Sequence, residues 1–395
     1  MSGPLSGLRI LDLTRVLAGP YTTMILADLG AEVIKVEQPE IGDESRNFGP
    51  FNNGFSLYFM SINRGKKSLT LNLKNDQGKE LFKQLLKQYD ILIENYRPGT
   101  MRKLGLDYET LSNENPSLIY AACSGFGQTG PYSEQGAYDM IIQGMGGIIS
   151  ITGEPDGPPV RVGTSISDIT AALFTTIGIL TALHHRNKTG KGQMVDVAML
   201  DSLVAILENA IVRYFATDDI PQPLGTRHPV ITPFEAFRSA DGYVIIAIGN
   251  DTLWEKFCKH TNNEELISDE RFNTNAVRTE NHSELYSILS SIISSRSTDE
   301  WIESLGNIGV PCGPINSIDE VVNHEQVRAR EMITNVAHQI TGKVAIPGVP
   351  IKLSDTPGGI DKPAPTLGEH TEEILKDILN LNEQDIEMLQ RDGVI

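Results

Sequence analysis

The amino-acid sequence predicts an α/β fold, built on a parallel sheet and followed by a smaller mixed α/β domain. The chain begins with a strand–helix–strand pattern, and short apolar runs alternate with helical stretches up to residue 200. Strands that alternate with helices favour a parallel sheet. A Pro/Gly-rich stretch at residues 217–232 then separates a second region. We predict a large domain over residues 1–215, a small domain over 216–330 and a C-terminal segment over 331–395 that returns to the large domain.

The strands of the large domain are predicted from short apolar runs bounded by Gly, Pro or polar residues. They cover residues 8–14, 32–36, 68–73, 91–94, 117–124 and 193–199. Helices are expected over residues 21–29, 77–88, 138–146, 169–183 and 201–215. The small domain is predicted to contain a strand over 242–249 and helices over 253–260, 281–295, 298–306 and 318–323. A strand at 342–346, a helix at 370–379 and a short segment near Ile395 follow.

Composition indicates a soluble globular protein of 395 residues, with 40% hydrophobic and 21% charged residues. The N-terminal stretch has no basic region followed by an apolar one, so we expect a cytoplasmic protein rather than a secreted one. The longest apolar stretch, Ile169 to Leu183, is interrupted by four threonines, and we expect it to be too short and too polar to span a membrane. Three scattered cysteines and eight histidines form no metal-binding pattern, so no metal site is expected.

The charge distribution indicates a polyanionic small molecule as ligand. The net charge of -18 argues against nucleic-acid binding. Residues 1–105 nevertheless carry 14 Lys/Arg against 11 Asp/Glu, so one end is relatively basic. The alternative is that this asymmetry only reflects solvated helix faces.

Three loops are expected at the carboxyl ends of strands, where α/β sheets bind ligands. They are residues 15–20, 95–99 and 125–131, with Lys74, Arg102 and Lys103 nearby. Cationic side chains and free backbone N–H groups suit phosphate. The first loop holds a single glycine, so it is not a dinucleotide-binding fingerprint, and no Walker motif occurs in the chain.

Asp168 is the candidate nucleophile. It follows Thr164-Ser165-Ile166-Ser167 and precedes an apolar run, a pattern that predicts the start of a helix. The positive end of the helix dipole favours an ionised carboxylate there, and such a group can act as a nucleophile in acyl transfer. The alternative is that Asp168 only caps the helix.

Many blocks in order resemble the class III CoA-transferases (the CaiB/BaiF group), which include formyl-CoA:oxalate, acetyl-CoA:oxalate and succinyl-CoA:glutarate CoA-transferases. The blocks include LRILDLTRVLAGPYTT, NRGKKSLTLNLKN, ENYRPGTMRKLGL, SGFGQTGPY, GPPVRVGTSISDI and KTGKGQMVDVAM, and the resemblance covers essentially the whole chain. Leu17 stands where the formyl-CoA transferase pattern has glutamine, and only Ile248-Gly249-Asn250 remains of its glycine loop. The chain is more similar to the acetyl-CoA:oxalate and succinyl-CoA:glutarate branch.

The resemblance implies a Rossmann-like large domain and ring-shaped subunits interlocked as a homodimer. It implies that an acyl-CoA and a small carboxylic acid, such as oxalate, are the substrates, with no tightly bound cofactor and no nucleic-acid or membrane partner. Asp168 would be the nucleophile. The implied CoA-binding residues are Val16, Leu17, Ala18, Leu71, Asn72, Lys74, Asn95, Tyr96, Arg97 and Lys103, and the implied substrate residues are Tyr138, Asp139 and Gly249.

Two alternatives to a transferase remain. Acyl-CoA racemases are similar, but their histidine base is replaced here by Tyr138, whose ordinary pKa of about 10 makes it a poor base. A CoA-binding protein without catalytic activity is the second, and the retained TSISDI segment argues against it.

Overall fold

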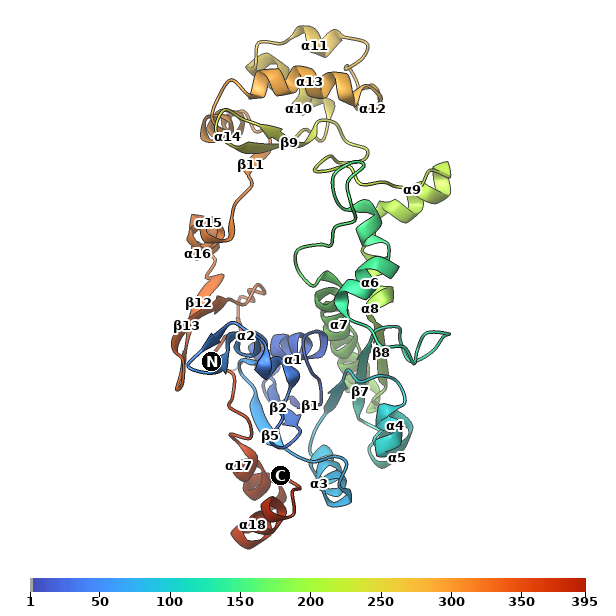
Figure 1. The fold of residues 1–395 in the computed structure, drawn as a ribbon, viewed down its shortest axis with the longest axis vertical. Helices are drawn as coiled ribbons and strands as arrows, with labels where there is room; N and C mark the ends of the chain where they lie inside the picture. The colour runs from blue at the N-terminus through green and yellow to red at the C-terminus, as the bar shows by residue number, and fades with distance from the viewer. Residues whose placement is uncertain (1–2) are drawn as a thin grey trace. The chain divides into compact units, whose positions relative to one another are not determined.

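The computed structural model describes residues 3–395, and a six-stranded parallel sheet forms the centre of its larger part (Figure 1). The strand order is β5-β2-β1-β6-β7-β8, and every neighbouring pair is parallel. The strands are β1 (Arg9–Asp12), β2 (Glu32–Glu37), β5 (Lys67–Thr70), β6 (Ile91–Glu94), β7 (Ile119–Ser124) and β8 (Met194–Ala198). The predicted α/β class and its parallel sheet are thus confirmed.

Successive residues of these strands face opposite sides of the sheet, and each side has its own apolar core. Ile10, Val33 and Ile91 pack in one cluster with residues of α1 (Ala18–Asp28) and α7 (Ile166–Thr189). The residues that follow them in each strand pack in the other cluster, with α3 (Asp76–Leu86) and the C-terminal helices α17 (Thr371–Leu379) and α18 (Glu383–Arg391). Helices therefore cover both faces, as a parallel sheet requires.

The strand order reverses between β1 and β6. From β1 the chain builds outward through β2 to β5, and it then returns to place β6, β7 and β8 on the other side. In doubly wound sheets, ligands bind at such a reversal, outside the carboxyl ends of the strands. The loops that follow β1 and β6 are therefore the first place to search for a site.

The remaining elements of this region are short. They are β3 (Phe51–Asn52), β4 (Phe55–Ser56), α2 (Leu57–Asn63), α4 (Thr100–Leu104), α5 (Tyr108–Glu114), α6 (Asp139–Met145), α8 (Met199–Ala205), α9 (Asn209–Thr217), α16 (Glu325–Ala329), β12 (Ile333–His338) and β13 (Gly342–Pro347). The helix predicted over residues 201–215 is wrong, because the chain breaks between α8 and α9, where Glu208 has a φ of 53°.

Helix α7 is longer than predicted, and its length differs from the expectation that this apolar stretch is too short to span a membrane. It runs for 24 residues, and by length and composition it passes as a possible membrane span, the one such helix in residues 3–395. A core helix of a globular domain passes the same test. Since α7 packs against α1, α8, β7 and β8, its apolar character is partly explained by burial within the sheet domain.

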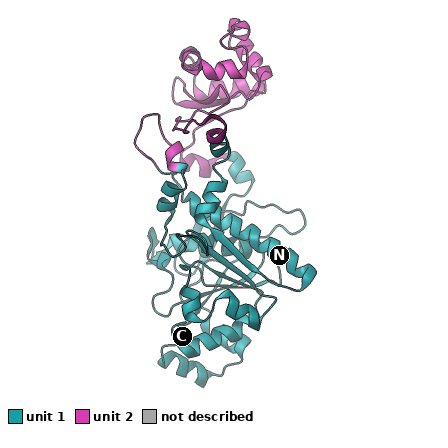
Figure 2. Ribbon diagram, turned by 90° about the vertical axis from the view of Figure 1, so that its right-hand side faces the viewer, with its two compact units in different colours: residues 1–148, 161–212, 325–395 teal, residues 149–160, 213–324 magenta. Residues whose placement is uncertain are grey.

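Contacts divide the chain into two compact units (Figure 2). The first comprises residues 1–148, 161–212 and 325–395, and the second residues 149–160 and 213–324. In the second, β9 (Phe234–Arg238), β10 (Tyr243–Ala247) and β11 (Cys312–Pro314) form an antiparallel sheet. Its helices are α10 (Asp251–His260), α11 (Glu265–Ser268), α12 (Asn275–Glu280), α13 (His282–Ile293), α14 (Thr298–Asn307) and α15 (Ile318–Asn323). The domain boundaries at 215 and 330 stay a prediction.

Candidate active site

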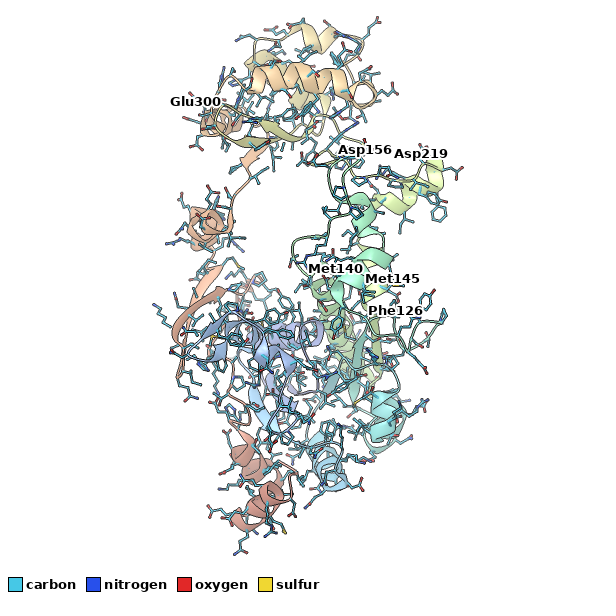
Figure 3. All side chains as sticks on the ribbon, viewed as in Figure 1. Phe126, Met140, Met145, Asp156, Asp219 and Glu300 are labelled. Carbon is cyan, nitrogen blue, oxygen red and sulfur yellow. The ribbon has the colours of Figure 1, made fainter. Side chains whose placement is uncertain are left out.

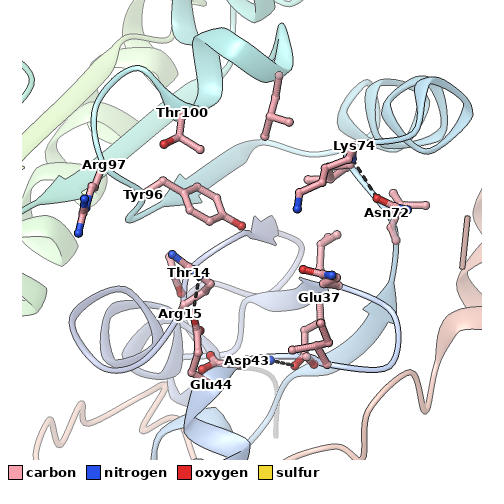
Figure 4. Close-up of a pocket in the computed structure, with 17 residues that line it drawn as sticks. Thr14, Arg15, Glu37, Asp43, Glu44, Asn72, Lys74, Tyr96, Arg97 and Thr100 are labelled. Carbon is pink, nitrogen blue, oxygen red and sulfur yellow. Dashed lines mark hydrogen bonds and ion pairs between the residues drawn. The ribbon is translucent and has the colours of Figure 1, made fainter. Parts of the chain in front are cut away.

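Two adjoining cavities lie at the carboxyl ends of the parallel strands, within the first unit. The larger, of about 520 Å³, is bounded by the segments that follow β1, β2, β5 and β6 (Figure 4). The smaller, of about 200 Å³, lies between the segments that follow β1, β6 and β7 and the first turn of α7. Both cavities are lined by Arg15, Glu44, Tyr96 and Arg97, so they share a wall at the β1–β6 reversal.

The residues that the resemblance implies for CoA are distributed over these two cavities. Leu71, Asn72 and Lys74 line the larger one. Val16, Leu17, Ala18 and Asn95 line the smaller one, and Tyr96 and Arg97 line both. Lys103 lies in neither cavity and is exposed on α4. The structure thus brings together nine of these ten residues, and their role in binding CoA remains a prediction.

Asp168 lines the smaller cavity from the first turn of α7, where the sequence predicted a helix start. Its side chain is half-buried and makes no hydrogen bond or ion pair with residues 3–395. Burial, and then the charge of Asp139, raise the pKa of Asp168 to about 7. These two effects therefore outweigh the helix dipole, which on its own favours the ionised form.

Asp139 performs the capping role that the sequence left open for Asp168. Its Oδ1 accepts hydrogen bonds from the backbone N–H of Ser167, at 3.0 Å, and from the Ser167 hydroxyl, at 2.5 Å. Its Oδ2 accepts one from Nε2 of Gln143, at 2.7 Å. An N-cap side chain satisfies the same kind of backbone donor near a helix start. Helix α7 is thus capped by a residue of α6, and the carboxylate of Asp168 is left unengaged.

Tyr138 and Asp139 have different environments although they are adjacent. Tyr138 lines the smaller cavity, and 73% of its surface is exposed. Asp139 is buried and lines neither of the two cavities. Gly249, the third implied substrate residue, follows β10 in the second unit and is exposed there. Tyr138 and Asp139 therefore place an exposed ring next to a buried carboxylate.

A buried ion pair fixes the loop after β1, and the sequence reasoning missed it. Lys35 and Asp43 are fully buried, and Nζ lies 2.8 Å from Oδ2. Lys35 also donates to the carbonyl oxygen of Thr14, at 2.6 Å, while Oδ1 of Asp43 accepts from the N–H of Val16, at 3.1 Å. Val16 has a φ of 66°, which is unusual for a β-branched residue. A lysine in the middle of an apolar strand was the available signal, since buried lysines are almost always paired.

The amide of Asn95 joins the loops after β1 and β6. Its Oδ1 accepts from the N–H of Arg15 and its Nδ2 donates to the carbonyl oxygen of Arg15, both at 2.8 Å. The guanidinium of Arg15 lies over the ring of Tyr96, at 4.9 Å from its centroid, and pairs with Glu44. The shared wall of the two cavities is therefore a connected polar frame.

No group of His, Cys, Asp and Glu side chains suited to hold a metal ion occurs in residues 3–395. Cys123 lines the smaller cavity near Asp168, but burial raises the pKa of its thiol to about 12. Burial, and then the charge of Asp168, likewise raise the pKa of Tyr58 to about 12. Both groups are therefore neutral near pH 7, and Asp168 is the ionisable group in this cavity best placed to act as a nucleophile.

Comparisons with known proteins show what the whole chain is similar to. The model of CoA-transferase family III matches residues 5–371. The chain is 42% identical to the succinyl-CoA:glutarate CoA-transferase of Mus musculus, over 99% of this chain and 90% of that protein. It is 43% identical to the acetyl-CoA:oxalate CoA-transferase of Acetobacter aceti, over 93% and 94% of the two chains. A crystal structure of a CaiB/BaiF family protein from Brucella suis aligns with a TM-score of 0.84 and 41% identity, over 96% of this chain and all of that one.

Proposed function

This chain belongs to CoA-transferase family III, and on that premise we propose that it transfers CoA from an acyl-CoA to a small dicarboxylic acid through a thioester on Asp168. The observation that carries the proposal is the state of the Asp168 carboxylate. It opens into a cavity of about 200 Å³ without any hydrogen-bond partner in residues 3–395. A structural carboxylate in a half-buried position is normally hydrogen-bonded, so an unengaged one suits a covalent role.

The chemistry requires only one carboxylate that forms and breaks acyl bonds. An oxygen of Asp168 attacks the thioester carbonyl carbon of the donor, the C–S bond breaks, and CoA leaves as a thiolate. The thiolate then attacks the Asp168 carbonyl carbon of this mixed anhydride and releases the donor acid, which leaves a thioester between Asp168 and CoA. The acceptor carboxylate repeats the two steps in reverse order and departs as the new acyl-CoA.

The two cavities suit the two parts of the donor. The larger one is lined by Lys74 and Arg97, and cationic side chains of this kind pair with the phosphates of CoA. The smaller one is lined by Asp168 and by apolar parts of Val16, Leu17 and Ala18, and its volume suits a short acyl group. The pantetheine arm would pass the shared wall formed by Tyr96 and Arg97.

A dicarboxylate is the acceptor class that the relatives favour. Their names include glutarate, oxalate and mesaconate as acids, and succinyl-CoA recurs as the donor. Choice among such acids depends on a few contacts. An acid that leaves a buried polar group of the pocket unpaired binds far more weakly than one that pairs it. We therefore propose the class and not one acid.

A screen of donors against acceptors tests this function. Purified protein is mixed with acetyl-CoA, succinyl-CoA or formyl-CoA and with oxalate, glutarate, mesaconate or a monocarboxylic acid, and the acyl-CoA products are identified by mass spectrometry. The expected result is a new acyl-CoA with dicarboxylates. A racemase would instead incorporate deuterium from heavy water at the α-carbon of a chiral acyl-CoA and form no new thioester, which would overturn the proposal.

We also propose that two subunits interlock as a homodimer. Large apolar side chains are exposed on three helices that pack against one another in the first unit, α6, α7 and α8. They are Met140, Ile141, Met145, Leu173, Phe174, Ile177 and Val204 (Met140 and Met145 are labelled in Figure 3). Apolar side chains gathered in this way support a protein–protein contact.

A further inference from the structure

The carboxylates of Asp139 and Asp168 lie at the same helix start, but only one of them accepts hydrogen bonds. Asp139 accepts three hydrogen bonds, from the backbone and hydroxyl of Ser167 and from Gln143. Asp168 accepts none from residues 3–395. No ion pair within the described part of the chain involves either carboxylate. When both are ionised, the site therefore holds two like charges, and neither forms an ion pair with a cation of the described chain.

Hydrogen bonds hold the first turn of α7 in place relative to Asp139. Ser167 directly precedes Asp168, and it is bound to Asp139 through both its N–H and its hydroxyl. Gln143 supports the same carboxylate, and its Oε1 accepts from the N–H of Val162, at 2.9 Å, on the loop that leads into α7. Asp139 thus holds the residue that precedes Asp168, and its charge repels the Asp168 carboxylate.

We propose that Asp139 is a positioning residue for the nucleophile, which fixes the first turn of α7 through Ser167 and keeps an uncompensated negative charge beside Asp168 that acylation relieves. This inference rests on the proposed role of Asp168. In the attack step, the negative charge of the Asp168 carboxylate moves to the departing CoA sulfur, and the mixed anhydride formed on Asp168 is neutral at that position. The repulsion present before the reaction is therefore absent afterwards, which favours formation of the intermediate.

The surroundings of Asp168 leave Asp139 as the principal charge that acts on it. Burial raises the pKa of Tyr58, on α2, and of Cys123, on β7, to about 12, so both are uncharged at neutral pH. The other ionisable groups that line the cavity are Arg15, Glu44, Tyr96, Arg97 and Tyr138. Among the groups that raise the pKa of Asp168 to about 7, only Asp139 carries a charge.

The pH dependence of kcat/KM for the donor separates charge from geometry. Attack requires ionised Asp168, so the activity of the wild-type protein falls as pH decreases through about 7. Asp139→Asn removes the repelling charge, and its acidic limb should move to lower pH by about one unit. At high pH its plateau should drop, because a less basic carboxylate is a weaker nucleophile. The two curves should cross.

Two further variants make the test decisive. In Asp139→Asn the new amide faces the Nε2 donor of Gln143, so Asp139→Asn combined with Gln143→Glu restores that hydrogen bond and returns one negative charge to the cluster. This double variant should move the acidic limb back toward that of the wild type. Ser167→Ala removes the hydroxyl that donates to Asp139 but keeps the charge of Asp139, and the acidic limb of this variant should stay in place.

A limb that stays unchanged in Asp139→Asn while only the plateau falls would overturn the inference, and so would a double variant whose limb remains displaced. The proposed function is checked separately by CoA labelling of the peptide that contains Asp168. If the wild-type peptide is labelled but the acidic limb of Asp139→Asn does not move, only the proposed role of Asp139 is refuted. Wild-type protein that turns over without any label refutes the role of Asp168 and the inference together.

Discussion

At the scale of single residues, two aspartates 29 positions apart have opposite roles because of their hydrogen bonds. Asp139 is buried and its carboxylate accepts three hydrogen bonds, whereas Asp168 faces a cavity and has no donor in the described chain. The sequence identified Asp168 from its place before an apolar run. It could not reveal that Asp139 caps α7, because that contact depends on how α6 and α7 pack.

The raised pKa of Asp168 has a consequence for stability. The folded protein favours the neutral carboxyl, so this contribution to stability is present at low pH and is lost as pH rises toward about 7. In the Asp168→Asn variant the side chain at this position is never charged. This variant should therefore unfold at a higher temperature than the wild type at pH 8, and the difference should shrink toward pH 5. Thermal melts of both proteins across this range measure it. Asp377→Asn, at an exposed position on α17, should show no such trend.

At the scale of elements, the reversal of strand order between β1 and β6 determines where the loops meet, and side chains then lock them together. The short apolar runs of the strands made the sheet predictable, and these residues form its two cores. The side chains that join the loops could not be predicted from the sequence. Lys35, Asp43 and Asn95 bind backbone atoms of residues that are distant in the sequence. The break before α9 was missed because neither Gly nor Pro marks it.

The amide of Asn95 should affect CoA binding without contacting the chemistry. Asn95→Ala removes two hydrogen bonds to Arg15, each worth about 1 kcal/mol. The loops after β1 and β6, which form the shared wall of the cavities, are then no longer joined by this side chain. We expect the KM for acyl-CoA to rise about tenfold with kcat little changed. Steady-state kinetics measure this, and Asn113→Ala, at an exposed position on α5, is the matched control. A fall in kcat at unchanged KM would contradict a role in positioning the loops.

Two cations distinguish direct contact with CoA from general surface charge. Arg97 lines both cavities, while Lys103 lies in neither. Arg97→Ala should raise the KM for acyl-CoA several-fold at low salt, and the effect should diminish as salt increases. Lys103→Ala should change the KM much less, although the resemblance implies that it binds CoA. Equal effects of the two substitutions would show that only the net charge of this end matters.

At the scale of the whole molecule, the exposed apolar side chains of α6, α7 and α8 are the basis of the proposed dimer. An interlocked dimer predicts about twice the chain mass of 43.3 kDa by light scattering, with no dissociation on dilution. Ile177→Glu, on α7, should destabilise the dimer, whereas Gln84→Glu, on α3 at the other face of the sheet, should not. A stable monomer of wild-type protein would contradict this proposal.

The family could be identified from the sequence, because long motifs occur in order over the whole chain. The fold class followed from the alternation of strands and helices. The division into units is harder to read, since the segment 149–160 joins residues that come 53 positions or more later. Such a return depends on packing between distant segments, which no local pattern reports.

The thioester on Asp168 is the central claim, and trapping it is the most direct measurement. Protein is incubated with donor acyl-CoA and no acceptor, digested, and analysed by mass spectrometry. The account predicts the mass of CoA on the peptide that contains Asp168, its release by hydroxylamine with a hydroxamate left on that residue, and no label in Asp168→Asn. Unlabelled peptide from protein that is turning over, or a label on Asp139, would contradict it.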